Sequence, residues 1–457
     1  MRIAFALGTL AALALGGCNG AGGYVCTTND NCVHNGKQGT CLPGGDGNSY
    51  CAFSDPSCGS GQRWDDSAAA PLGGQCVVTP DGGVDMATAD LATPDLASSS
   101  DLSMPDFSTR PATNLSFGIA TRYAVGTYPS GVAIGDFNGD GRPDFAVSSA
   151  GMARVDVLIN SGNGVFASAV SHPVGNALPK GITTGDWNGD GKSDIALADD
   201  LGNLVVMLSQ APSGFAQPVF YPAGMGPDSV VSADFNHDGK DDLAVANGID
   251  GAVSVFINNG DGTFTAGMGL MAGTQPTVIK AGDLNGDGKA DLVVSDYGSD
   301  QISEFINGGS GSFGPANNYT LTQAWGIAVT DIDGDGRLDV VGASTSGNAV
   351  GVFINSGSGA LKPMVSYPAG GRPSTLVSAD LNGDGKPDVA VILEAGPSVL
   401  LNMGAGGTLG SPIAISVPIT SGKAFEDVAS ADFNGDGRND LVVLAQDGCN
   451  VLLNTSK

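Results

Sequence analysis

The nine residues Asp136-Phe-Asn-Gly-Asp-Gly-Arg-Pro-Asp144 decide how this chain folds, because six further copies of this pattern follow at nearly constant spacing. The later copies begin at Asp186, Asp234, Asp283, Asp331, Asp380 and Asp432, so that successive copies start 48 to 52 residues apart. Periods of this length are typical of propellers and other repeat architectures. Residues 115–457 are therefore a tandem array of seven equivalent units.

Each unit predicts four strands. An alternating apolar segment precedes the nine-residue loop, as in Val132 to Asp136, and another follows it, as in Asp144 to Ser148. A third segment ends near Asn160 and leads through a glycine turn into a fourth. Period-two alternation indicates strands, and four strands in about 48 residues make one propeller blade. The expected fold class is all-β, a seven-bladed β-propeller of four-stranded blades.

The two ends of the array predict that the ring closes. The sequence ends at Lys457, where every other unit continues into a fourth strand. The segment from Phe117 to Tyr128 has the character of that missing strand. If it pairs with the last blade, no sheet edge stays open at the closure. An open, solenoid-like array is the alternative.

Each nine-residue loop offers oxygen atoms at alternate positions, which is the spacing that a hard cation requires. Ca²⁺ takes roughly six to eight oxygen ligands at about 2.3–2.6 Å. Side-chain oxygens are available at positions one, three, five and nine, and a main-chain carbonyl at position seven. Gly141 at position six allows a left-handed backbone in the turn. Position two is apolar in every copy, as expected of a side chain that packs inward.

The predicted ligands, up to seven Ca²⁺ in all, fall into five sets. Position one is Asp136, Asp186, Asp234, Asp283, Asp331, Asp380 and Asp432. Position three is Asn138, Asn188, Asn236, Asn285, Asp333, Asn382 and Asn434. Position five is Asp140, Asp190, Asp238, Asp287, Asp335, Asp384 and Asp436. Position seven, through its carbonyl, is Arg142, Lys192, Lys240, Lys289, Arg337, Lys386 and Arg438. Position nine, as the closing and bidentate ligand, is Asp144, Asp194, Asp242, Asp291, Asp339, Asp388 and Asp440.

The loop has two other interpretations. An EF-hand would add Glu at position twelve and flanking helices, but position twelve is Val147 in the first copy and aliphatic or Gly in the others. A metal-free Asx turn is the second alternative, since Asp, Asn and Gly are common turn residues. Several carboxylates converging within a few ångströms would repel one another without a cation, which favours metal.

These residues resemble the FG-GAP or VCBS repeats, whose calcium loops of DxDxDGxxD type occur in the α-subunit propellers of integrins. The resemblance covers about residues 115–457 and implies Ca²⁺ at every loop. The departures are small: Asn replaces Asp at position three except at Asp333, and His237 replaces Gly at position four of the third loop. We expect the third site to be the weakest.

The first seventeen residues predict a secretion signal. Arg2 is followed by an apolar run from Ile3 to Leu15 that is too short to span a bilayer. The run ends in Leu15-Gly16-Gly17-Cys18, which resembles the lipobox of bacterial lipoproteins and implies a lipid on Cys18 of the mature protein. Asn19 resembles the signal for the outer membrane. Ordinary cleavage with a free Cys18 is the alternative.

Residues 18–76 predict a small disulfide-rich module, and residues 77–114 a spacer. Export favours three disulfides among an even set of cysteines, namely Cys26, Cys32, Cys41, Cys51, Cys58 and Cys76. Fifteen pairings stay open, and zinc is the alternative. The spacer is rich in Asp, Pro and Ser, which predicts a flexible linker, with leucines packed onto a neighbouring domain as the alternative. The eighth cysteine, Cys449, occupies an apolar repeat position and predicts a buried free thiol.

Charge and composition narrow the function. The formal net charge is −28, and nearly half of the 47 acidic residues lie in the seven loops. A chain of this charge does not favour nucleic acid or anionic membrane surfaces, so the lipid is the expected membrane contact. With three His and no GxSxG, HExxH or phosphate-binding loop, no enzyme is predicted.

The leading hypothesis is therefore a monomeric binding or adhesion scaffold, stiffened by calcium, for an extracellular protein or polysaccharide. A polysaccharide lyase or hydrolase is one alternative. A multivalent lectin with sugar pockets between the blades is another. In that case Trp325 could serve as a sugar platform, whereas Trp187, at loop position two, is expected in the core.

Overall fold

The computed structural model describes residues 115–456 except 211–213, 405 and 420–423, together with the backbone of five short strands nearer the N-terminus. The chain divides into two compact units, residues 1–106 and 107–457. In the first unit β1 (Val33–His34) pairs with β2 (Lys37–Gln38), and β3 (Thr40–Pro43), β4 (Ser49–Ser54) and β5 (Gln62–Trp64) form a sheet whose register sets Cys41 opposite Cys51. The predicted signal, lipidated Cys18, disulfides and linker lie outside the described residues and stay predictions.

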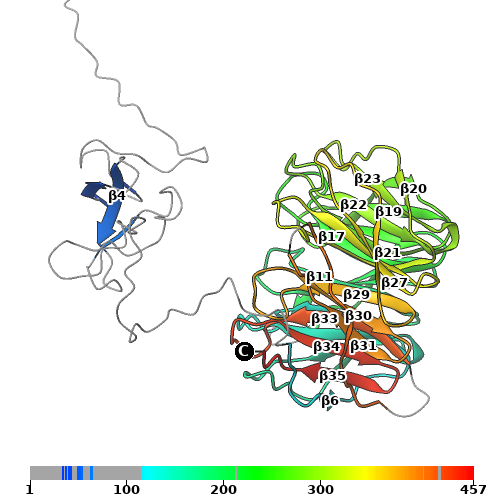
Figure 1. The fold of residues 1–457 in the computed structure, drawn as a ribbon. Coiled ribbons are helices and arrows are strands. Elements are labelled where there is room, and N and C mark those ends of the chain that lie inside the picture. Colours follow the sequence, from blue (N-terminus) through cyan, green and yellow to red (C-terminus); the bar gives the residue numbers. More distant parts are fainter. Residues whose placement is uncertain are drawn as a thin grey trace, which may run out of the picture. The chain divides into compact units, whose positions relative to one another are not determined.

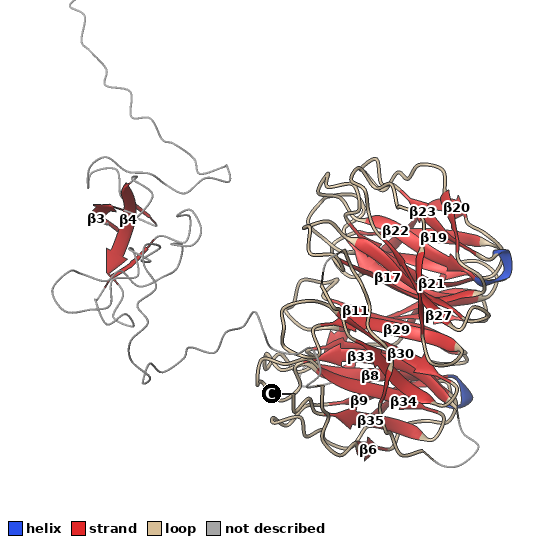
Figure 2. Ribbon diagram, in the orientation of Figure 1, coloured by secondary structure: helices blue, strands red, loops and turns tan. Residues whose placement is uncertain are grey.

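The second unit is built from seven four-stranded antiparallel sheets, which confirms the predicted propeller (Figures 1 and 2). Blade 1 consists of β7 (Pro129–Gly135), β8 (Asp144–Ser149), β9 (Arg154–Leu158) and β10 (Val170–Pro173). Blade 2 consists of β11 (Pro179–Gly185), β12 (Asp194–Asp199), β13 (Asn203–Met207) and β16 (Val219–Pro222). Blade 3 consists of β17 (Pro227–Ala233), β18 (Asp242–Asn247), β19 (Ala252–Asn258) and β20 (Phe264–Met271).

The remaining blades repeat this order. Blade 4 consists of β21 (Pro276–Gly282), β22 (Asp291–Asp296), β23 (Gln301–Phe305) and β24 (Asn317–Thr320). Blade 5 consists of β25 (Ala324–Thr330), β26 (Asp339–Ser344), β27 (Ala349–Phe353) and β28 (Val365–Pro368). Blade 6 consists of β29 (Pro373–Ala379), β30 (Asp388–Leu393), β31 (Gly396–Leu400) and β32 (Ile413–Ala414). Blade 7 contains β33 (Phe425–Ala431), β34 (Asp440–Ala445) and β35 (Gly448–Leu452).

The fourth strand of blade 7 comes from the beginning of the propeller, as the sequence predicts. β6 (Thr121–Tyr123) pairs antiparallel with β35, with Tyr123 opposite Cys449 (Figure 1). A further bridge joins Phe117 to Asn454. The strand is shorter than the predicted segment from Phe117 to Tyr128, because only three of its residues find partners along β35. The closed ring leaves blade 7 paired like the other six.

The core of the propeller lies between the blades. All six residues of every second strand are buried, as in β8 and β26, because both faces of each sheet pack against neighbouring blades. Seven clusters of buried apolar side chains occupy the seven interfaces between adjacent blades. The first strands contact one another in a ring that β33 closes against β7. The blades therefore surround a central axis lined by their first strands.

Smaller elements lie between the strands. Blade 2 carries an extra hairpin of β14 (Ser209–Gln210) and β15 (Gly214–Phe215), and two 3₁₀ turns, η3 (Ala150–Met152) and η4 (Tyr297–Ser299), follow second strands. Cys449 is a buried free thiol, as predicted. Among the residues that the structure describes, no helix is long and apolar enough to cross a membrane.

Candidate metal centre

The seven nine-residue loops lie at one end of the blades. Each begins directly after a first strand and ends at the first residue of a second strand, as Asp136 follows β7 and Asp144 begins β8. Because all first strands run in the same direction around the ring, all seven loops share one face. Every position-two side chain is buried, which confirms its predicted inward packing: Phe137, Trp187, Phe235, Leu284, Ile332, Leu381 and Phe433.

Backbone amides of each loop donate hydrogen bonds to the side-chain oxygens at positions one, three and five of the same loop. The pattern recurs in all seven copies. In the first loop Asp136 Oδ1 accepts from the amide of Asp140 (3.1 Å) and Asp136 Oδ2 from the amide of Gly141 (2.7 Å). The same Asp140 amide also donates to Asn138 Oδ1 (2.9 Å), and Asp140 Oδ1 accepts from the amide of Arg142 (3.0 Å). Gly141 has φ +80°, the left-handed conformation that its position requires.

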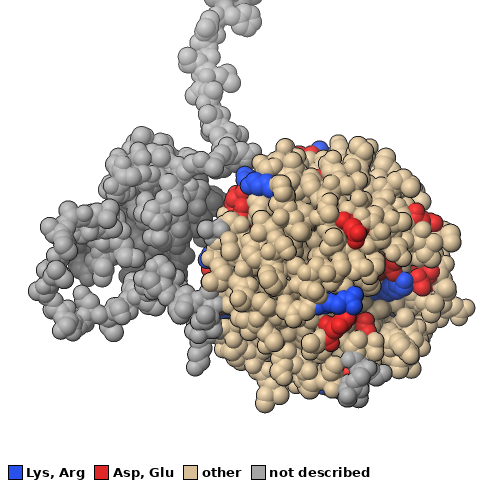
Figure 3. Space-filling model, turned by 45° about the vertical axis from the view of Figure 1, so that its right-hand side comes forward, with Lys and Arg blue, Asp and Glu red and all other residues tan. Residues whose placement is uncertain are grey.

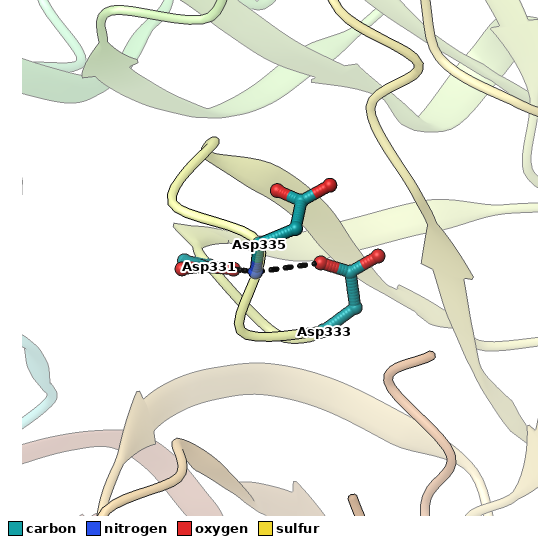
Figure 4. A group of neighbouring side chains, drawn as sticks. All are labelled: Asp331, Asp333 and Asp335. Atoms are coloured by element: carbon teal, nitrogen blue, oxygen red, sulfur yellow. Dashed lines mark hydrogen bonds between the residues drawn. The ribbon is translucent and has the colours of Figure 1, made fainter. Parts of the chain in front are cut away.

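The fifth loop brings three carboxylates together (Figure 4). Asp331, Asp333 and Asp335 each place one oxygen within 4.8 Å of the others. An ion with metal–oxygen distances of about 2.3–2.6 Å holds ligand oxygens up to about 5 Å apart. The three side chains therefore fit a hard divalent cation such as Ca²⁺. In the other six loops Asn occupies position three and makes the same hydrogen bonds, so an amide oxygen stands where Asp333 stands here.

The carboxylate at position nine is held away from this group by the backbone. Asp339 is fully buried and does not belong to the group of three; its Oδ1 accepts from the amide of Asn355 (2.7 Å) and its Oδ2 from that of Ile332 (3.0 Å). The equivalent pair of amide bonds occurs in every blade. Each carboxylate oxygen has a second lone pair and can bind a metal ion while it accepts an amide hydrogen bond. Bidentate metal binding by the position-nine carboxylate therefore stays a prediction.

Burial dominates the ionisation of the position-nine carboxyls, because desolvation disfavours their charged form. It outweighs the two amide hydrogen bonds and raises the pKa of Asp144, Asp242, Asp339 and Asp440 to about 6 and that of Asp388 to about 7. The pKa values of Asp194 and Asp291 are raised for the same reason. A nearby cation would favour the ionised form of all seven.

The basic side chain at position seven lies beside the carboxylate at position five. Lys289 Nζ is 3.0 Å from Asp287 Oδ2, Arg142 pairs with Asp140, and three further loops have the same pairing. The positive charge of the Lys or Arg side chain offsets part of the repulsion between the loop carboxylates. Figure 3 shows basic and acidic side chains next to one another at several places on one face of the molecule.

An asparagine that sequence reasoning did not single out joins each loop to the preceding blade. Asn355, just after β27, is fully buried, and its Nδ2 donates to Leu284 O (2.6 Å) in the fourth loop and to Leu338 O (2.9 Å) in its own. Its backbone amide holds Asp339. Six of the seven blades contain this Asn clamp: Asn160, Asn258, Asn307, Asn355, Asn402 and Asn454.

Blade 2 departs from this pattern. Ser209 occupies the clamp position, and its amide still donates to Asp194 (2.7 Å), but its hydroxyl donates to Asp190 of its own loop (3.4 Å) instead of to the loop of blade 1. The recurrence of Asn at one position in six repeats was the signal that could have revealed the clamp. The partner carbonyl lies 70 to 73 residues earlier in five clamps and, for Asn160, 273 residues later at Phe433, which no local pattern indicates.

His237 is the one loop residue at position four that is not glycine, and it adopts φ +63°. A side chain in the left-handed region costs roughly 1–2 kcal/mol relative to the ordinary helical region. A Cβ at the equivalent Gly139 would meet only the side chain of Lys192, at 3.7 Å. The cost at His237 is therefore one of backbone conformation rather than of crowding.

The repeats match a family model for the FG-GAP-like repeat. Six overlapping matches, each spanning two successive loops, cover residues 136–197, 186–245, 234–294, 283–342, 331–391 and 380–443. Together they include more than half of the chain. The chain therefore belongs to the FG-GAP-like repeat family. No curated protein matches the chain in sequence.

Solved structures show the same fold at low identity. The N-terminal domain of BBS1 in complex with ARL6 is 13% identical with a TM-score of 0.54, covering 74% of this chain and 96% of that one. Virginiamycin B lyase from Staphylococcus aureus is 11% identical (TM-score 0.52; 74% and 99% covered), and the WD40 propeller domain of Doa1 is 13% identical (0.51; 75% and 98%). At these identities the likeness concerns the propeller fold alone.

Proposed function

We propose that this protein is an exported, lipid-anchored, calcium-binding propeller that acts as a binding or adhesion scaffold for an extracellular protein or polysaccharide. The observation that carries the calcium role is the group of Asp331, Asp333 and Asp335, whose oxygens lie within 4.8 Å of one another. The same loop hydrogen bonds recur in all seven blades. Calcium at these loops would stabilise the folded ring, because ions that bind the native state shift unfolding by mass action.

Thermal melting of the full chain with and without EDTA tests this role, together with calcium stoichiometry after equilibrium dialysis. We expect seven bound Ca²⁺ and a lower melting temperature in EDTA. Asp335→Ala should remove one ion, because it deletes a carboxylate of the group. Asp333→Asn is the matched control: it restores the position-three residue of the other six loops and should keep seven. An unchanged melting temperature with no bound calcium would remove the proposal.

Binding rather than catalysis is the role proposed for the propeller. The blade period varies only from 48 to 52 residues, which leaves no room for an inserted catalytic module. Incubation of the calcium-loaded protein with a panel of neutral and acidic polysaccharides separates the two roles. Release of new reducing ends or of unsaturated sugar products would favour a hydrolase or a lyase instead.

Export and anchoring rest on the segment that ends at Cys18. Cells that express the chain and are fed an alkyne-tagged fatty acid should incorporate the tag into the protein, and Cys18→Ser should abolish incorporation. Fractionation of the envelope should place the tagged protein in the outer membrane or at the cell surface. A protein that is secreted without the tag would contradict the anchor and leave the calcium role untouched.

A further inference from the structure

A cavity of about 820 Å³ lies on the propeller axis. Residues of all seven first strands line it, and the turns after β12, β18 and β22 complete its rim. Those turns lie at the end of the blades where first strands begin, whereas the metal loops follow the end of first strands. The cavity therefore opens on the face opposite the metal loops. Its volume lies in the range of about 300–1,000 Å³ typical of small-ligand sites.

Two aromatic residues, Trp325 and Tyr297, line the rim of this axial cavity. Trp325 is 40% exposed and lies edge-to-face with Tyr297, with ring centroids 5.1 Å apart. Its carbonyl accepts from Thr277 Oγ1 (3.3 Å) and from Ser295 Oγ, which fixes the backbone beneath the ring. The second residue of the other six first strands is polar or charged in every case: Ser130, Lys180, Asp228, Thr277, Ser374 and Glu426. An exposed indole here is thus a departure from the repeat.

Polar groups of both signs surround the aromatic pair. Lys180 Nζ lies between Asp200 (2.9 Å) and Asp228, so its charge is already matched. Glu426 Oε1 accepts from Gln446 (2.7 Å). Asp427 accepts from the amide of Val132 (3.1 Å) in blade 1 and from Thr375 Oγ1 (2.9 Å) in blade 6. These groups are held in fixed positions around the cavity before any ligand arrives.

Lys280 is the one charged residue at the fifth position of a first strand; its equivalents are Ala133, Thr183, Val231, Ala328, Val377 and Ala429. Its side chain is accessible to solvent within the cavity. Among the described residues it forms no ion pair, and Asp427 is the charged group that acts on it. Desolvation inside the axial cavity lowers the pKa of the Lys280 ammonium, and the negative charge of Asp427 acts in the opposite direction. Lys280 therefore offers hydrogen-bond donors to whatever enters.

We infer that the axial cavity binds the end of a neutral oligosaccharide, with Trp325 as the stacking surface and Lys280 as a hydrogen-bond donor to ring or hydroxyl oxygens. A sugar ring presents an apolar C–H face to an aromatic ring and hydroxyls that both donate and accept. Fixed carboxylates and ammonium groups complement that mixture. The cavity is lined by four carboxyl side chains and two ammonium side chains, an excess of acidic groups that disfavours an anionic ligand. The acidic residues are Asp200, Asp228, Glu426 and Asp427, and the basic residues are Lys180 and Lys280. The inference deepens the proposed scaffold role by naming the ligand class.

The test uses the calcium-loaded full chain on an array of neutral oligosaccharides and matched oligosaccharides that contain uronic acids, followed by calorimetric titration of any sugar bound. We expect binding to neutral members. Trp325→Ala and Lys280→Met should each weaken it by about tenfold or more, equivalent to about 1.4 kcal/mol. Phe220→Ala is the matched control, because Phe220 is 42% exposed and lies outside the cavity.

Melting curves of each variant in calcium and in EDTA accompany the titration. If Trp325→Ala does not fold, Lys280→Met still decides the outcome. Absence of neutral-sugar binding at millimolar concentration, binding to acidic sugars alone, or binding that neither variant weakens would each overturn the inference. Because the calcium-dependent melting shift is measured on the same samples, failure of the sugar site is distinguished from failure of the calcium scaffold.

Discussion

The Asn clamp predicts that replacing Asn355 by Ala destabilises the ring without removing a calcium ion. The variant loses three hydrogen bonds: two from Nδ2 to Leu284 O and Leu338 O, and one from the amide of Gly357 to Oδ1 (2.9 Å). The backbone amide that holds Asp339 remains. The loop therefore keeps its form while the link to the preceding blade is lost.

The expected loss of unfolding free energy depends on which hydrogen-bonding groups lose their partner in Asn355→Ala and cannot reach water. Leu284 is 1% exposed, so its carbonyl is left without water or protein partner, at a cost of about 1–3 kcal/mol. Leu338 and Gly357 are only half-buried and can turn to water, so each lost bond there costs about 0.5–1.5 kcal/mol or less. We expect a loss of about 2–4 kcal/mol in the free energy of unfolding.

Urea denaturation of the full chain in excess calcium measures this change as a shift in midpoint at unchanged slope. Ser356→Ala is the matched control, because Ser356 is exposed and its hydroxyl bonds only within its own turn, to Ala360 O (2.6 Å). It should cost less than about 1 kcal/mol. A loss of less than about 0.5 kcal/mol for Asn355→Ala, or the disappearance of one bound calcium, would refute the reasoning.

Four further predictions follow from single residues. Ser209→Asn should supply the clamp that blade 2 lacks and raise stability by about 1 kcal/mol, and a decrease in the urea midpoint would contradict it. His237→Gly should stabilise the third loop by about 1 kcal/mol and tighten its calcium binding, whereas Gly286→His should weaken the fourth loop by a similar amount. Burial raises the pKa of Glu304 from 4.5 to about 7, so Glu304 should contribute a loss of stability as the pH rises across that interval, beside the loss from the buried position-nine carboxyls. Glu304→Gln should remove the Glu304 part, at most about 3 kcal/mol, and leave a shallower pH profile, whereas equal profiles for the variant and the wild type would exclude this. Burial also raises the pKa of Cys449 to about 12, so its thiol should react with iodoacetamide only after unfolding, as read by mass spectrometry.

The local features of the propeller could be predicted from the sequence because they repeat at short range. The spacing of the loops predicted seven blades, and the alternation around Asp144 predicted the strands on either side. The apolar residue at position two predicted burial, which Phe137 confirms. Each of these inferences needs only the period of the repeat and the geometry of a strand or a turn.

Contacts between residues of different blades could not be predicted from the repeat. The position-nine carboxyls were predicted as metal ligands, and the folded chain adds amide bonds from Asn355 and its equivalents that no spacing indicated. The sequence did not indicate the axial cavity, which residues of all seven first strands line. Trp325 and Lys280 belong to different blades, and only the closed ring brings them to one cavity.

The sequence by itself determined the number of blades and the oxygen donors of each loop, because these depend on periodicity within about fifty residues. It also indicated the strand that closes the ring, because the last repeat lacks its fourth segment and an unpaired segment precedes the first repeat. Tertiary structure alone decided which carbonyl each clamp asparagine meets and which side chains share the axis. The physical reason is that these residues belong to different blades: the clamp contact from Asn355 joins residues 71 positions apart, and Lys280 and Trp325 meet at one cavity only because the ring of first strands closes.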